Sequence, residues 1–131
     1  TAVAKQKDLI DKLHKCGAKV LMSTHIKKFT PADEVLKIAL AHQSRGADIS
    51  KIVVGAENTE QQLENLKMIN MLKEKLDVPF LFLSGGECKI LRRIGGELGC
   101  CMYLCVYEYD NFATPLQPLL KKVKAIRDNM D

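Results

Sequence analysis

The sequence of 131 residues contains no tryptophan, and aromatic residues make up only 5% of it. Its formal net charge of +4 comes from lysines and arginines that are scattered over segments of helical pattern, with few aromatics between them. Nucleic-acid-binding proteins instead gather basic residues into a patch and stack bases on aromatic side chains. We therefore do not expect nucleic acid as a partner.

Long hydrophobic runs are also lacking. No run approaches the roughly 18 apolar residues that suggest a membrane span, and residues 1–7 do not resemble a secretory signal. We therefore expect no membrane partner and a cytoplasmic location. The remaining composition, 47% hydrophobic and 27% charged, is typical of one globular domain, which we place at residues 1–131.

Paired cysteines are a third missing feature. The cysteines are odd in number and lack the spacing of a zinc site or a redox motif; they are Cys16, Cys88, Cys100, Cys101 and Cys105. We interpret them as small reduced core residues, three of them in one late strand. We expect neither a metal nor a cofactor.

Strand and helix patterns alternate from one end of the sequence to the other. They predict strands at 19–24, 47–54, 78–83 and 101–106, and helices at 8–16, 30–46, 59–76, 88–98 and from 114 onward. Helical connections between successive strands predict a parallel sheet, because parallel neighbours cannot be joined by a hairpin. The predicted fold class is therefore α/β, with four βα units.

Local signals predict how these helices begin and which side they bury. The Thr30 hydroxyl is expected to cap the second helix. Leu63 is expected on the buried side of the third helix, in one stripe with Leu66, Ile69 and Leu72. Thr114 and Gln117 have the spacing of a capping box for the last helix.

Four βα units are compatible with two architectures. They can form half of an eight-stranded (β/α)8 TIM-type barrel, with parallel strands inside and helices outside, whose full form needs roughly 250 residues. They can also flatten into a small open sheet of flavodoxin type. In the half-barrel, the helix at 8–16 would belong to the last unit of a missing first half.

Lys51 interrupts the otherwise apolar strand at 47–54. Because side chains alternate along a strand, Ile49, Lys51 and Val53 share one face, and both faces look apolar. Burial favours a neutral amine, which can attack a carbonyl and form an imine. Alternatively, Lys51 ends the strand, and its stem lies on apolar neighbours while the ammonium reaches solvent. On this segment alone we prefer the second interpretation.

Four features follow one another along the sequence: a histidine at a strand end, a lysine within the next strand, an arginine in a helix and a Pro-x-Gln loop. The histidine ends the segment 22–25, which is followed by Thr30 and Pro31, and the lysine lies in the segment 47–52. The arginine is Arg93, with Ser84 before it and Gly96, Glu97 and Gly99 after it, and the Pro-x-Gln loop is 115–117. In this order and spacing they resemble the C-terminal half of type I 3-dehydroquinate dehydratase. The resemblance implies the later four units of a (β/α)8 barrel and a carbon–oxygen lyase of the shikimate pathway.

Two residues would carry the chemistry by this resemblance. Lys51 is implied to condense with the ketone of 3-dehydroquinate, and the imine then serves as the electron sink for dehydration to 3-dehydroshikimate. His25 is implied to be the general acid and base, which suits an imidazole because its unperturbed pKa lies near neutrality. Without the resemblance, His25 would be interpreted as a satisfied polar residue at a strand end.

The resemblance also implies substrate-binding residues. Arg93 would hold the substrate carboxylate with its planar fork of donors, which leaves Arg92 as an ordinary cation on the helix surface. Gln117 would bind substrate hydroxyls. The family's loop serine falls at Ala113, so the adjacent Thr114 is expected to substitute for it. The alternatives are two solvent-facing arginines and, for Gln117, the capping box.

An incomplete pocket also follows from the resemblance, because the family's other substrate contacts come from the first half of the barrel. The loop at 84–87 lacks the family's methionine and glycine pattern, which bears on substrate affinity. An open half-barrel exposes strand edges and an apolar face. We therefore expect a second copy, a separate N-terminal half, or a longer enzyme of which this is a piece.

Two other functions stay open: a catalytically inactive half-barrel or assembly module, and another Schiff-base enzyme such as a class I aldolase.

Overall fold

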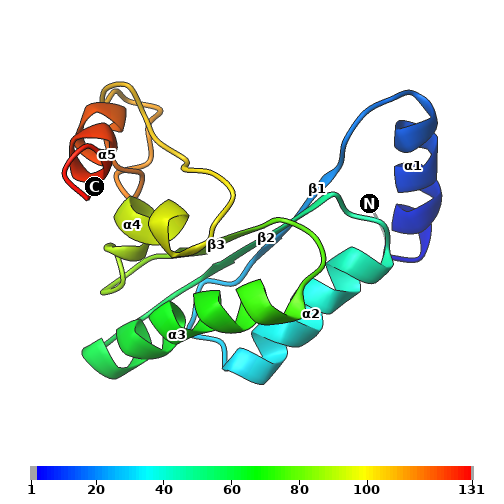
Figure 1. Cartoon of the computed structure of the whole chain (residues 1–131), viewed down its shortest axis with the longest axis horizontal. Helices are drawn as coiled ribbons and strands as arrows, with labels where there is room; N and C mark the ends of the chain where they lie inside the picture. The colour runs from blue at the N-terminus through cyan, green and yellow to red at the C-terminus, as the bar shows by residue number, and fades with distance from the viewer. Residues whose placement is uncertain (1–2, 131) are drawn as a thin grey trace.

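The computed structural model describes residues 3–130, in which helices and strands alternate (Figure 1). The elements are α1 (Val3–Lys15), β1 (Leu21–His25), α2 (Ala32–Ser44), β2 (Ile49–Val54), α3 (Thr59–Lys75), β3 (Phe80–Ser84), α4 (Leu91–Leu98) and α5 (Leu120–Arg127). The predicted α/β class is confirmed. Among these described helices, none has the length and apolar character needed to cross a membrane.

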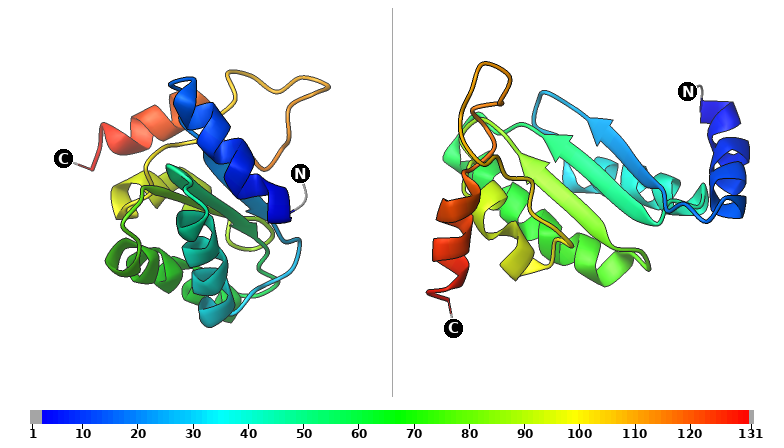
Figure 2. Two further views of the ribbon diagram at one scale, coloured as in Figure 1. Left: turned by 90° about the vertical axis from the view of Figure 1, so that its right-hand side faces the viewer. Right: turned by 90° about the horizontal axis from the view of Figure 1, so that it is seen from above.

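The strands form one parallel sheet in the order β1-β2-β3 within the described residues. Ser23 pairs with Lys51, and Lys51 pairs with Leu81 on the other side. Seen from above, the strands run side by side in one direction, with α1 and α5 at opposite ends of the molecule (Figure 2). Because the strands are parallel, their carboxyl ends and the loops that follow them meet at one edge of the sheet.

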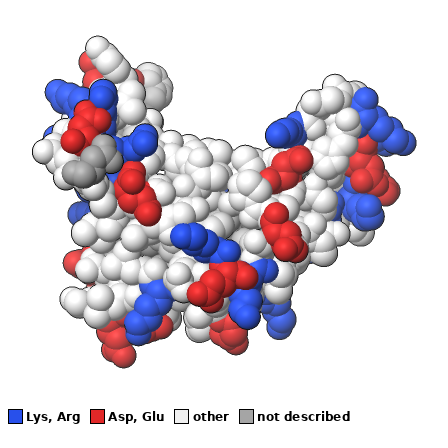
Figure 3. Space-filling view, viewed as in Figure 1, with Lys and Arg blue, Asp and Glu red and all other residues white. Residues whose placement is uncertain are grey.

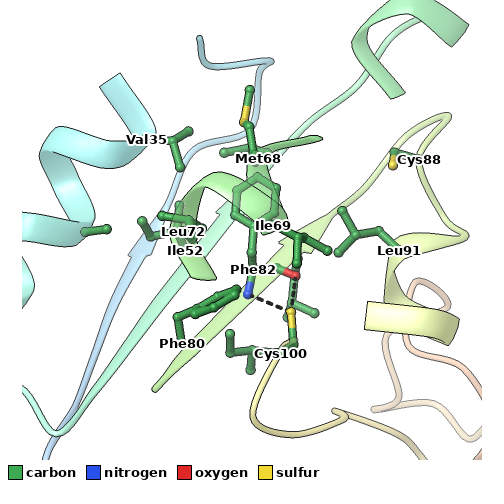
Figure 4. Close-up of a cluster of buried hydrophobic side chains, with 14 of the residues drawn as sticks. Val35, Ile52, Met68, Ile69, Leu72, Phe80, Phe82, Cys88, Leu91 and Cys100 are labelled. Carbon is green, nitrogen blue, oxygen red and sulfur yellow. Dashed lines mark hydrogen bonds between the residues drawn. The ribbon is translucent and has the colours of Figure 1, made fainter. Parts of the chain in front are cut away.

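One face of the sheet packs against α2 and α3 and forms the core (Figure 4). Phe82 of β3 and Ile52 of β2 are register partners on this face and are fully buried. They pack with side chains of α3, including Met68 and Ile69. Removal of these apolar side chains from water is the main stabilising contribution to such a layer.

The opposite face is open on β1 and β2. Leu21 is 40% exposed, and Lys51 and Val53 are half-buried. Figure 3 shows a hollow between α1 and the α4–α5 side, with mostly uncharged atoms on its floor, and Figure 1 places the strands below it. Although both faces of β2 look apolar in the sequence, no layer of the described chain covers this one, so Lys51 does not point into packed surroundings.

A fourth strand at 101–106 does not form. This segment forms no ladder: it makes an isolated bridge between Val106 and Leu119, and the Cys101 amide donates to the Phe80 carbonyl at 2.9 Å. The Cys100 Sγ accepts a hydrogen bond from the Phe82 amide at 3.5 Å and donates one to the Phe82 carbonyl at 3.6 Å. These are the backbone groups that a neighbouring strand would bind, so a side chain ends the sheet at this edge.

Two helix signals in the sequence are misleading. Pro31 occupies the N-cap of α2, and the Thr30 hydroxyl donates to the Lys28 carbonyl instead of capping the helix. Leu63 is 52% exposed, because the buried side of α3 is rotated toward Asn65 and its helical neighbours.

The last helix begins later than predicted. Thr114 and Gln117 lie in a turn before α5, where the Gln117 amide donates to the Thr114 carbonyl at 3.1 Å, so no capping box forms there. Pro118 explains the delay. A helix through residues 114–118 would leave the Thr114 carbonyl without its donor and would bring the proline ring against it.

The cysteines only partly match their predicted role. Cys88 and Cys100 are buried, Cys105 is half-buried, and Cys16 and Cys101 are exposed. The prediction of core positions therefore holds for two of them, and the late strand that was to contain three is absent from the described residues.

Candidate active site

β1 and β2 bring His25 and Lys51 together. His25 is the last residue of β1, and Lys51 lies inside β2 on the same face of the sheet. In register His25 pairs with Val53, so Lys51 is its diagonal neighbour two residues earlier. The Lys51 Nζ lies 3.2 Å from the His25 Nε2. An amine and an imidazole at this distance can exchange a proton directly.

The surroundings of this pair are cationic. Partial burial lowers the pKa of His25 most, and the positive charges of Lys51 and Arg92 lower it further. The imidazole is therefore neutral near neutral pH and can accept a proton. Lys51 is half-buried and forms no ion pair within residues 3–130. Its amine faces the imidazole, but the space around it is open rather than packed.

A cavity of about 450 Å³ opens beside His25 at the carboxyl edge of the sheet. Its lining includes residues from the loops after each strand and from α4: Lys27, Gly55, Glu57, Gly85 and Arg92. Cavities of this size hold small molecules, and this edge of a parallel sheet is where α/β proteins bind them. The lining carries two cations, Lys27 and Arg92, and one carboxylate, Glu57. The excess of positive charge favours an anionic ligand.

Two glycines allow the loops around the cavity to touch. The Gly55 amide donates to the Lys28 carbonyl at 3.0 Å, and a Cβ at Gly55 would collide with the Lys27 carbonyl oxygen. Gly86 has a φ of +60°, and a Cβ there would collide with the Ala56 carbonyl oxygen. The backbone after β1 thus rests on that after β2, which in turn rests on that after β3.

Arg92, rather than Arg93, reaches the cavity. Arg92 is 8% exposed, and its Nε donates to the Ser84 carbonyl at 2.8 Å. Arg93 does not line the cavity, and its Nη1 donates to the Lys89 carbonyl of the preceding turn at 2.7 Å. The prediction that Arg92 is an ordinary surface cation is therefore wrong, and the position of Arg93 does not support the role that the resemblance implies for it.

The environment of Arg92 suits the binding of an anion. Its bond to Ser84 is the one hydrogen bond of its side chain among the described residues, and no carboxylate pairs with it there. A buried cation with unused N–H groups is costly unless a partner joins it, and a carboxylate binds both edges of a guanidinium fork.

Thr114 and Gln117 lie away from the cavity. Both line a separate hollow within the loop at 106–117. Leu116 is the residue of this loop that reaches the cavity. The Gln117 carbonyl accepts a hydrogen bond from the Tyr109 hydroxyl at 2.9 Å, which holds the loop in this arrangement. The structure therefore brings Lys51 and His25 together, but not the two loop residues with them.

Asn65 is a residue of this region that sequence reasoning missed. It is fully buried on α3, and its Nδ2 donates to the Gly55 carbonyl at 3.1 Å and to the Ser84 Oγ at 2.8 Å. It thus ties the end of β2 to the end of β3 from behind the cavity. The available signal was its spacing, because Asn65 falls in the same helical stripe as the apolar Met68, Ile69 and Leu72.

Comparison with known proteins matches the chain to one family. Residues 1–127 match the family model described as type I 3-dehydroquinase. The 3-dehydroquinate dehydratase of Alkaliphilus oremlandii is 38% identical over 92 residues, which are 69% of this chain and 36% of that protein. The corresponding protein of Listeria welshimeri is 34% identical over 91 residues, with the same coverage. The chain thus spans about a third of the length of these curated relatives.

Solved structures share the fold. The 3-dehydroquinate dehydratase from Geobacillus kaustophilus matches with a TM-score of 0.86 at 21% identity, over 95% of this chain and 48% of that one. The type I enzyme from Clostridium difficile, solved with covalently modified comenic acid, matches with a TM-score of 0.85 at 23% identity, over 97% and 50%. The observed fold therefore corresponds to about half of these barrel proteins.

Proposed function

The chain belongs to the type I 3-dehydroquinase family, and we propose that it supplies the imine-forming half of an enzyme that dehydrates 3-dehydroquinate to 3-dehydroshikimate. The observation that carries the proposal is the 3.2 Å contact between the Lys51 Nζ and the His25 Nε2, beside a cavity at the carboxyl edge of the sheet. The names of the curated relatives support the substrate.

The two residues divide the chemistry between them. The Lys51 amine attacks the substrate ketone, and loss of water gives a protonated imine. The imine withdraws electrons from the neighbouring carbon, so His25 can remove a proton from it and leave an enamine. The electrons of the enamine then expel the β-hydroxyl, which leaves as water with the proton that His25 returns. Hydrolysis of the imine restores the amine and releases the product.

Arg92 is the residue that we assign to the substrate carboxylate. It is buried beside the cavity with N–H groups that no described residue accepts from, whereas Arg93 bonds to its own helix. We assign Thr114 and Gln117 to substrate hydroxyls, in contacts made when the loop at 106–117 folds over a bound substrate.

Completion of the barrel is part of the proposal. β1 pairs only with β2 among the described residues, and the sheet face that carries Lys51 is open. The chain corresponds to about half of each solved relative. We propose that a first half of the barrel covers this face, from the same polypeptide, a separate N-terminal chain or a second copy, and that turnover requires it.

Trapping of the imine tests the chemistry. The chain is incubated with 3-dehydroquinate, reduced with sodium borohydride and mapped by peptide mass spectrometry, with and without the N-terminal half of the Alkaliphilus oremlandii enzyme. We expect an adduct on Lys51 that disappears in Lys51→Met. Lys27→Met is the matched control, because Lys27 is a lysine that lines the cavity beside His25 and should not be required. Absence of the Lys51 adduct under both conditions would overturn the proposal.

A second candidate is a half-barrel without activity that serves as an assembly module. The distance of Thr114 and Gln117 from the cavity favours it. It predicts that Lys51→Met changes no property except stability, and that no substrate adduct forms at any concentration of the added half.

A further inference from the structure

A buried histidine lies on the other side of the sheet, behind His25 and Lys51. His42 of α2 is 3% exposed. Its Nε2 lies 2.9 Å from the Thr24 Oγ1, and its Nδ1 lies 2.9 Å from the Ser50 Oγ. Each ring nitrogen is therefore hydrogen-bonded, one to β1 and one to β2.

The two hydroxyls that His42 binds belong to the chain neighbours of the reactive pair. Thr24 precedes His25, and Ser50 precedes Lys51. Side chains alternate along a strand, so the hydroxyls point toward α2 while the side chains of His25 and Lys51 point to the open face of the sheet. Thr24 pairs in register with residue 52, so it faces Ser50 across a diagonal of two residues. His25 and Lys51 have the same offset on the open face of the sheet. His42 therefore bridges Thr24 and Ser50 on one face just as the amine and imidazole contact each other on the other face.

We propose that His42 is a positioning residue that maintains the contact between His25 and Lys51 by fixing their chain neighbours. The inference rests on the function proposed for that pair. β1 is the edge strand and is held by backbone bonds on one side only among the described residues. The front contact of 3.2 Å is near the upper end of hydrogen-bond distances, so a small slide of β1 along β2 would break it.

The charge state of His42 suits this role. Burial lowers its pKa most, and the positive charge of Arg45 at the C-cap of α2 lowers it further. The groups that β1 and β2 present to it are hydroxyls, which can each donate or accept, so a neutral imidazole satisfies both in either tautomer. A neutral ring exerts little field on His25, and its removal therefore acts on His25 only through position.

The titration of His25 measures this position without substrate. In the intact chain its pKa is lowered by burial, by Lys51 from β2 and by Arg92 from α4. NMR of the ring nitrogens can follow it, since the sequence has three histidines and each can be assigned by single substitution. In His42→Met, which keeps similar volume without the hydrogen bonds, the amine should move away. We expect the His25 titration midpoint to rise toward the ordinary histidine value.

Matched variants separate positioning from general loosening of the core. Thr24→Val and Ser50→Ala each remove one of the two hydrogen bonds, and each should give part of the rise. Val35→Ala is the control, because Val35 is a fully buried residue of the same helix that bonds to neither hydroxyl. Its His25 titration should not move, although the variant is less stable.

Two results would overturn the proposal. One is an unchanged His25 titration in His42→Met and in both hydroxyl variants; if His42→Met does not fold, the hydroxyl variants alone decide. The other is an equal rise in Val35→Ala. The titration needs no substrate, so the two proposals can fail separately. If the His25 titration shifts in the variants but the intact chain forms no borohydride adduct, the proposed dehydration is refuted and the positioning role stands. If the adduct forms but the titration does not shift, the positioning role is refuted and the proposed dehydration stands.

Discussion

Substitution of Gly55 by alanine should damage the site and the fold together. A Cβ at this position would collide with the Lys27 carbonyl oxygen and lie 3.1 Å from the Lys28 carbonyl carbon. Both obstacles are backbone atoms, so no flexible side chain can move out of the way. Gly55 does not have a positive φ, and the cost is therefore steric rather than conformational.

The size of the effect follows from the clash. The backbone after β1 must shift by roughly 1 Å, and such overpacking costs about 1–3 kcal/mol in free energy of unfolding. The shift also stretches the hydrogen bond from the Gly55 amide to the Lys28 carbonyl, now 3.0 Å. Lys27 follows His25 by two residues, so the imidazole moves with it. A misplacement of about 1 Å can lower a reaction rate about 100-fold.

Urea unfolding followed by circular dichroism measures the first effect, and the rate of borohydride trapping on Lys51 measures the second. Gly85→Ala is the control. Its Cβ would lie 3.6 Å from the Leu116 Cδ1, an ordinary contact, on the same cavity wall. We expect that control to change stability by less than about 0.5 kcal/mol. An unchanged urea midpoint in Gly55→Ala, or an equal loss in both variants, would refute the reasoning.

Three further predictions concern a sulfur, a histidine and an arginine. Cys100→Ala removes the Sγ that binds the backbone edge of β3, so we expect the free energy of unfolding, measured in urea, to fall by about 1–3 kcal/mol. Cys101 is exposed, so Cys101→Ala should lower it much less, and equal losses would contradict the prediction. His42 has a lowered pKa in the folded state, so the unfolded chain binds more protons and the free energy of unfolding should fall as pH drops below about 6.5. His42→Met should remove part of this fall in urea titrations at several pH values, and an unaltered pH dependence would speak against it. Arg92→Gln should weaken binding of a carboxylate substrate analogue about tenfold or more in calorimetry, while Arg93→Gln should not. The reverse order would restore the role that the resemblance implies for Arg93.

The resemblance, and not local pattern alone, singled out Lys51 and His25. The strand around Lys51 could be recognised because its apolar alternation and its flanking helices are local features, and the side-chain period of two then placed Lys51 on a defined face. His25 could be placed at a strand end for the same reason. Their 3.2 Å contact depends on the register of β1 against β2, which the alternation of strands and helices does not fix.

Two of the errors concern features that the strand and helix patterns do not determine. The fourth strand failed because the Cys100 side chain occupies the edge of β3, and strand patterns do not report such a bond. The choice between Arg92 and Arg93 depended on the phase of a short helix. Neighbouring residues on a helix point about 100° apart, so a start at Leu91 instead of residue 88 leaves the inward position undetermined by spacing alone.

Under the proposed function, the open sheet face would link the reactivity of Lys51 to assembly of the barrel. Lys51 and Val53 are half-buried on it, and Leu21 is 40% exposed. A first half of the barrel that covered this face would remove apolar surface from water and so stabilise the chain in proportion to its binding. The same contact would exclude water around the Lys51 amine, and burial favours the neutral, nucleophilic form of an amine. Addition of the N-terminal half of a relative should therefore raise both the urea midpoint of the chain and the rate of borohydride trapping on Lys51. Both should rise over the same range of concentrations of the added half. A stabilised chain whose trapping rate did not change would show that the covered face and the reactive face are different surfaces.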